Sequence, residues 1–82
     1  MSEEFSARHQ KALIQGFEGD FEGSLASFKH LVEEESTNLE VRYDLAMTQM
    51  MLGMYEEACR NLKFILEIDP HHEKALLQAV HC

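Results

Sequence analysis

The most informative stretch of this 82-residue sequence is Leu52-Gly53-Met54-Tyr55-Glu56-Glu57-Ala58. On both sides of its glycine, residues recur at the spacing of one face of an amphipathic α-helix. The stripe before the glycine is Val41, Leu45, Thr48 and Leu52, and the stripe after it is Ala58, Leu62, Ile65 and Leu66. Because glycine adopts the backbone conformations that tight turns need, the stretch predicts two helices joined by a short turn.

An internal repeat places a second such unit 34 residues earlier. When the sequence is aligned with itself at this offset, seven pairs are identical: Arg8/Arg42, Ala12/Ala46, Gln15/Gln49, Gly19/Gly53, Glu22/Glu56, Lys29/Lys63 and Glu33/Glu67. Self-similarity at a fixed period of this length is typical of stacked helical repeats. The sequence therefore predicts two copies of one helical hairpin, followed by the start of a third.

Residues near the helix ends set approximate boundaries. Asp20 is a suitable N-cap for the second helix, and Thr37-x-x-Glu40 has the form of a capping box that opens the third. Asp69-Pro70 ends the fourth, because the residue before a proline is disfavoured in the α conformation. The predicted fold is all-α, with five helices over residues 3–17, 21–35, 39–52, 55–68 and 72–81.

The second copy resembles a tetratricopeptide repeat (TPR). The resemblance is carried by Leu45, Ala46, Gly53, Tyr55, Ala58 and Pro70, and in the first copy by Ala12, Gly19, Asp20, Phe21 and Phe28. The first copy departs from the family's pattern at Lys11, where leucine is usual, and at Ser36, where proline is usual. The resemblance implies a right-handed stack of antiparallel helix hairpins, with repeat 1 at about 5–38, repeat 2 at about 39–72, and a capping helix or partial third repeat at 73–82.

Small residues fall where helices of such a stack would cross. Ala12 and Ala46 lie where the partner helix crosses, and Ser24 and Ala58 allow the second helix of each pair to approach closely. One hairpin cannot bury its own apolar face, so we expect neighbouring hairpins to share a core.

The resemblance also implies a function, because TPR proteins usually bind other proteins in a concave groove formed by the first helix of each repeat. The groove positions of this sequence are His9, Leu13, Gly16, Phe17, Glu40, Tyr43, Asp44, Met47, Met50, Met51, Lys74, Leu77 and Gln78. In the subclass that clamps a terminal carboxylate, several of these sites hold Lys, Asn or Arg. Here Lys74 alone matches, and Asp44 would repel a peptide C-terminus, so we do not expect a carboxylate clamp.

The groove residues instead favour a peptide or helix with apolar anchors and Lys or Arg. Methionine packs adaptably around different partners, and Asp44 and Glu40 supply acidic groups at the rim. An alternative is that Met47, Met50 and Met51 belong in part to the core between the helices.

Composition excludes other partners. The net charge of −8 opposes binding to nucleic acid or to anionic membranes, because both depend on Lys and Arg. A basic protein is a better electrostatic match, although an acidic excess also serves solubility alone. No run of residues is apolar and long enough to span a membrane, and the start Met1-Ser2-Glu3-Glu4 is acidic where a targeting peptide would be basic. We therefore expect a cytoplasmic protein.

Catalytic and metal-binding patterns are missing from the sequence, so we expect no enzyme, no cofactor and no metal site. His71-His72 and His81-Cys82 are separated by a helix length of about 15 Å, too far for one ion within a single chain. Cys59 and Cys82 are too few and too far apart for a disulfide framework or a redox pair, which predicts unpaired thiols in a reducing compartment.

The last helix has apolar residues on more than one face, which is unusual for a TPR capping helix. Two copies of the chain could bury Leu76, Leu77 and Val80 in a homodimer interface. Alternatively, the chain is an accessory fragment of a larger protein whose next helix covers this face, or the C-terminal end is frayed.

Overall fold

The computed structural model describes residues 3–82, and five α-helices account for most of them. The helices are α1 (Glu3–Phe17), α2 (Phe21–Glu34), α3 (Leu39–Met51), α4 (Tyr55–Ile68) and α5 (Glu73–Ala79). The predicted all-α fold is confirmed, and each predicted helix end lies within two residues of the observed one. Met1 and Ser2, part of the acidic start, lie outside the described residues.

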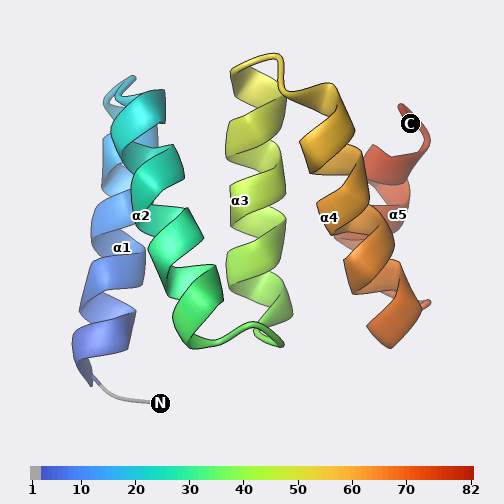
Figure 1. Ribbon diagram of the computed structural model, residues 1–82, viewed down its shortest axis with the longest axis horizontal. Helices are drawn as coiled ribbons and strands as arrows, with labels where there is room; N and C mark the ends of the chain where they lie inside the picture. The colour runs from blue at the N-terminus through green and yellow to red at the C-terminus, as the bar shows by residue number, and fades with distance from the viewer. Residues whose placement is uncertain (1–2) are drawn as a thin grey trace.

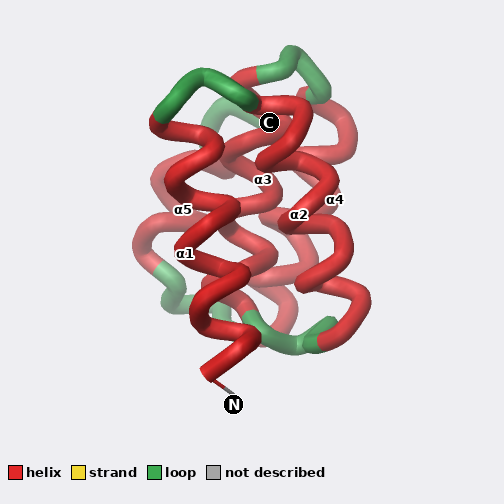
Figure 2. The backbone as a smooth tube through the Cα atoms, turned by 90° about the vertical axis from the view of Figure 1, so that its left-hand side faces the viewer, coloured by secondary structure: helices red, strands yellow, loops and turns green. Residues whose placement is uncertain are grey.

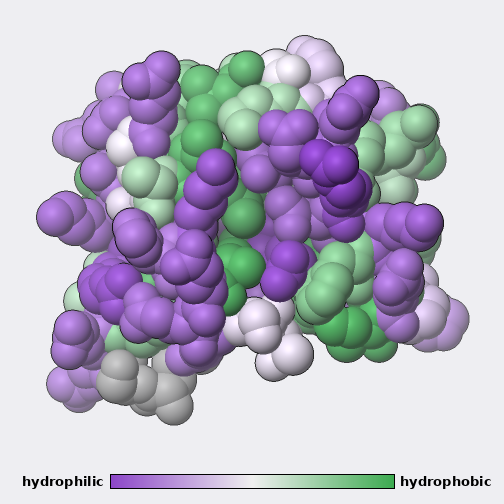
Figure 3. Space-filling view, viewed as in Figure 1, coloured by the Kyte–Doolittle hydropathy of each residue, from purple (hydrophilic) through white to green (hydrophobic). Residues whose placement is uncertain are grey.

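Helices that follow one another in the chain pack side by side (Figure 1). α1 pairs with α2 and α3 pairs with α4, while α2–α3 and α4–α5 contacts join one pair to the next. Viewed along the stack, α1, α3 and α5 form one layer and α2 and α4 the other (Figure 2). The face turned to the viewer in Figure 3 is largely hydrophilic over α1 and α2, as expected for a surface in water.

The two glycine turns behave as the repeat predicts. Gly19 and Gly53 both have positive φ, at 89° and 76°, a conformation that costs glycine little and other residues more. After the first turn, the Asp20 side chain accepts a hydrogen bond from the backbone N–H of Gly23 at 2.9 Å. The predicted N-cap of α2 is therefore confirmed.

The predicted capping box before α3 is wrong. The N-cap is Asn38, whose Oδ1 accepts a hydrogen bond from the N–H of Val41 at 3.2 Å. α3 begins at Leu39, so Thr37 lies one residue too early to reach the free N–H groups of its first turn. A threonine and a glutamate at the right spacing do not form a capping box when an asparagine between them occupies the N-cap position.

Two groups of buried side chains form the core, and α3 belongs to both. The first consists of Phe5, Ala12, Phe28, Leu31, Val41 and Leu45. The second consists of Ala46, Ala58, Leu62, Ile65 and Ala75. The small residues expected at helix crossings, Ala12, Ser24, Ala46 and Ala58, are all fully buried. The predicted sharing of a core between neighbouring hairpins is thus confirmed.

The 34-residue repeat extends to polar contacts between paired helices. In the first hairpin, Ser27 donates a hydrogen bond to the Gln15 side chain at 2.9 Å. At the equivalent position of the second hairpin, the Asn61 side chain donates to Gln49 at 2.8 Å. The repeated glutamine therefore joins the two helices of each hairpin in the same way.

The structure contradicts the prediction of unpaired thiols, because Cys59 and Cys82 form a disulfide. They are 23 residues apart in sequence, but α5 folds back along α4 and brings their Cα atoms within 5.8 Å, a distance typical of disulfides. Cys59 therefore links α4 covalently to the segment after α5.

Within residues 3–82, none of the helices combines the length and the apolar character needed to cross a membrane.

The substitution Ala46→Leu tests the helix crossing. Ala46 is 0% exposed, so the added methyl groups should overpack the contact between α3 and α4 and lower the free energy of unfolding by about 1–3 kcal/mol. Urea unfolding measures this, with Ala26→Leu on the exposed side of α2 as a control that changes stability by less than about 0.5 kcal/mol. An unchanged urea midpoint for Ala46→Leu would show that the helices do not pack tightly there.

Candidate binding groove

The layer of α1, α3 and α5 carries the predicted groove residues, and we refer to its surface as the groove. Two hollows open along it. The first, which we call the apolar hollow, has a volume of about 370 Å³. It is lined by Leu13, Gly16 and Phe17 from α1, by Phe21, Ser24 and Phe28 from α2, and by Asp44, Met47, Thr48 and Met51 from α3.

Two large apolar side chains that line the apolar hollow are exposed to solvent. Phe17 is 87% exposed and Met51 is 64% exposed. Leu13 and Met47 are half-buried and pack against the core on one side while they line the hollow on the other. Met50 packs against the core and lines neither hollow. The three methionines are therefore divided between surface and core.

The second hollow, which we call the polar hollow, lies between α3 and the start of α5 and has a volume of about 480 Å³. Its lining residues are Glu40, Tyr43, Asp44, Asp69, His71, His72, Glu73 and Lys74. Four of these side chains are carboxylates, whereas the lysine is the single Lys or Arg in the lining. This excess of negative charge is unfavourable for a peptide carboxylate and favourable for a cation.

A hydrogen bond between His9 and Asp44 joins α1 to α3 across the groove. His9 Nε2 lies 2.7 Å from Asp44 Oδ2, and both side chains are largely buried. The His9 ring also packs edge-on against Phe28, with ring centres 5.9 Å apart. Asp44 lines both hollows, so this pair lies at the boundary between them. Sequence reasoning placed both residues in the groove but did not pair them.

Burial perturbs the titrating groups of α3. Burial raises the pKa of Asp44 above its ordinary value of 3.8, and the hydrogen bond from His9 partly opposes this shift. The pKa of Tyr43 is also raised, by burial and by the neighbouring Asp44 charge, while contact with Gln78 lowers it. Each shift reflects the cost of holding a negative charge in a partly dry surface.

α5 supplies the third wall of the groove. Lys74 Nζ lies 5.9 Å from the centre of the Tyr43 ring, and the His72 ring lies at the same distance from it. Leu77 is 69% exposed and lines neither hollow. The helix therefore contacts α3 through its first turn and through Gln78.

Several residues that line the two hollows were not predicted from the sequence. Phe21 and Phe28 of α2 were assigned to the repeat pattern, because the second helix of a repeat was not expected to contribute to the groove. Thr48 of α3 was assigned to the buried stripe of its helix, and it lines the hollow although it is buried. Asp69, His71, His72 and Glu73 lie where α4 turns into α5, and histidines there were considered only as metal ligands. Among residues 3–82, no group of three or more His, Cys, Asp or Glu side chains is placed to hold a metal ion.

The raised pKa of Asp44 predicts a measurable pH dependence. A carboxyl group with a raised folded-state pKa stabilises the fold fully below its unfolded pKa, and this contribution is lost as pH rises through the folded pKa. The stability of the native chain, relative to Asp44→Asn, should therefore fall as pH rises from about 3.8 through the raised pKa.

NMR titration of the Asp44 carboxyl carbon measures the pKa directly. Its midpoint should lie above 3.8 and should rise further in His9→Ala, because His9 lowers it. A midpoint at or below 3.8 would contradict the expectation that the effect of burial on this pKa exceeds that of the His9 hydrogen bond.

Comparison with known proteins agrees with the repeat seen in the structure. A profile of the tetratricopeptide repeat family matches residues 18–59, which extend from the first glycine turn through α2 and α3 into α4. No curated protein and no solved structure matches the chain. The family profile covers half of the sequence, and the five helices pack as consecutive pairs. The chain therefore belongs to the tetratricopeptide repeat family, whose members generally act as protein–protein interaction modules rather than as catalysts.

Proposed function

We propose that this chain is a non-enzymatic interaction module that binds a peptide or helix of a partner protein in the groove of α1, α3 and α5. The observation that carries the proposal is the apolar hollow beside an acidic polar hollow, with Asp44 lining both. A ligand that crosses this boundary would place an apolar anchor in one hollow and a Lys or Arg side chain in the other. The proposed contact residues are His9, Leu13, Phe17, Glu40, Tyr43, Asp44, Met47, Met50, Met51, Lys74, Leu77 and Gln78.

The apolar hollow supports an anchor because its exposed edge has no evident role in folding. Phe17 and Met51 are large apolar residues that leave most of their surface in water. Exposed apolar groups that gather around a hollow are typical of interaction sites. A flexible methionine at this edge can adapt to side chains of different shape.

Charge supports a basic partner. The chain has a net charge of −8, and the polar hollow adds a local excess of carboxylates around Lys74. Acidic surfaces of this kind accelerate the approach of basic ligands and disfavour acidic ones.

Binding of designed peptides tests the proposal. The probes are two helical peptides that share Phe and Leu anchors, one flanked by lysine and the other by glutamate. The lysine peptide should shift the NMR signals of Met47 and Met51 and bind at least about tenfold more tightly than the glutamate peptide. The double variant Phe17→Ser/Met51→Ser should weaken its binding at least about tenfold.

Ile14→Ser is the matched control. Ile14 is an exposed apolar residue of α1, like Phe17, but it lines neither hollow. Its substitution should leave binding unchanged. Equal loss of binding in Ile14→Ser, or equal affinity for the two peptides, would argue against the groove.

Self-association through α5 is a second candidate function, supported by exposed apolar side chains. Leu76, Leu77 and Val80 are 45%, 69% and 78% exposed. α3 and α5 begin 34 residues apart, at Leu39 and Glu73, which supports the proposed third repeat at 73–82. When α5 is aligned with α3 at this 34-residue offset, Val80 is equivalent to Ala46, which packs against α4. A second copy related by a two-fold axis would place its α5 antiparallel to the first, in the manner of a hairpin partner.

Light scattering across a dilution series tests self-association. The native chain should form a dimer at high concentration, and Val80→Glu should give a folded monomer, because two glutamates would face each other across the axis. Ile68→Glu, at an exposed apolar residue of α4, should leave the dimer intact. A monomeric mass at every concentration would remove this candidate and leave the groove proposal standing.

A further inference from the structure

α5 is the least firmly packed helix of the stack. It has seven residues, of which Ala75 alone is buried, and its contacts with the rest of the molecule are mainly with α4. Helices of this length are not stable by themselves in water. The position of α5 therefore depends on how its two ends are held.

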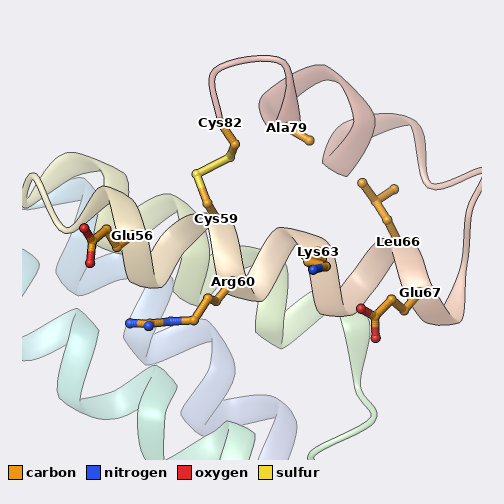
Figure 4. A pocket seen from close by; sticks show the side chains of 8 residues that line it. All are labelled: Glu56, Cys59, Arg60, Lys63, Leu66, Glu67, Ala79 and Cys82. Atoms are coloured by element: carbon orange, nitrogen blue, oxygen red, sulfur yellow. A yellow bond between two sulfur atoms is a disulfide. The ribbon is translucent and has the colours of Figure 1, made fainter.

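Each end of α5 has a distinct attachment. At its beginning, His72 caps the helix, because Nδ1 accepts a hydrogen bond from the N–H of Ala75 at 3.0 Å. Beyond its last residue, Cys82 forms the disulfide with Cys59 of α4. Figure 4 shows the disulfide bridging from α4 to the segment after α5, with Ala79 and Leu66 lining the same cleft. The disulfide is thus a covalent attachment between the end of α5 and the stack.

We propose that Cys59 and Cys82 form a redox-controlled clasp, which holds α5 against α4 when oxidised and releases it when reduced. Cys82 is exposed and Cys59 is half-buried, and both line a cleft of about 670 Å³ between α4 and α5. A small thiol can therefore reach the disulfide. In reducing compartments, disulfides of this kind are usually transient and redox-sensing rather than permanent.

The exchange requires a low-molecular-weight thiol such as glutathione. Its thiolate attacks one sulfur of the Cys59–Cys82 bond, which breaks and leaves the other cysteine as a thiolate that takes up a proton. A second glutathione then attacks the mixed disulfide. The products are glutathione disulfide and two protein thiols, so two electrons and two protons have passed to the chain. Oxidation by glutathione disulfide reverses these steps.

Opening of the clasp would act on the groove. Lys74 and Gln78 of α5 contact Tyr43 of α3, and Lys74 lines the polar hollow. Release of α5 would remove one wall of that hollow and weaken binding of a basic ligand, a consequence that rests on the function proposed above. The clasp itself is tested without any ligand, so the two proposals can fail separately.

Limited digestion with trypsin reports on the clasp, because Lys74 lies in α5 and Lys29 in α2. Cleavage after Lys74 requires α5 to open, whereas cleavage after Lys29 requires the first hairpin to unfold. Reduction should accelerate cleavage after Lys74 by about tenfold or more and leave cleavage after Lys29 unchanged. After digestion is stopped, all samples are reduced and alkylated and the products are quantified by mass spectrometry. This step separates fragments that the disulfide would otherwise hold together.

Cys59→Ser is the matched variant, since it removes the bond without altering α5. It should be cleaved after Lys74 at the fast rate under both oxidising and reducing conditions. The proposal is overturned if oxidised and reduced chains are cleaved after Lys74 at the same rate, or if Cys59→Ser is cleaved as slowly as the oxidised chain. Equal acceleration after Lys29 would also overturn it, because the bond would then stabilise the whole fold rather than α5.

Redox control is tested by equilibration in glutathione buffers. The exposed disulfide should be largely reduced in about 5 mM reduced glutathione, since exposed disulfides are generally easier to reduce than buried structural ones. A disulfide that stays fully formed under these conditions would be structural, and the switching proposal would be wrong.

Discussion

Burial of α3 on two sides is the interaction on which the rest of the structure depends. Val41 and Leu45 complete the core shared with α1 and α2, and Ala46 belongs to the core shared with α4 and α5. Neither hairpin can cover its own apolar face, so the first is covered by α3 and the second by α5. The small side chain of Ala46 allows α4 to pack closely against α3.

The same helix determines what the groove presents. With its apolar residues directed into two cores, α3 turns Tyr43, Asp44 and Met47 toward the hollows. His9 reaches Asp44 from α1, and Lys74 reaches Tyr43 from α5. The shape of the groove therefore follows from how the helices stack. Its polar hollow depends on α5, which has fewer buried residues than any other described helix.

Sequence reasoning was most successful where the controlling interactions are local or periodic. The helices follow from apolar spacing, the turns from Gly19 and Gly53, and the end of α4 from Asp69-Pro70. The candidate groove residues come from the family register and stay a prediction. The pairing of His9 with Asp44 could not be predicted, because it depends on the separation and rotation of two helices. The Cys59–Cys82 disulfide was missed for the same reason, since only the path of α5 along α4 brings the sulfurs together.

Native-state amide hydrogen exchange tests the central role of α3 most directly. If both hairpins depend on it, amides of α3 should exchange only through global unfolding, and their opening free energy should equal the free energy of unfolding measured with urea. The amides of α1, α2 and α4 should be no better protected. The account would be contradicted if α1 and α2 kept their protection under conditions in which α3 and α4 had already lost it.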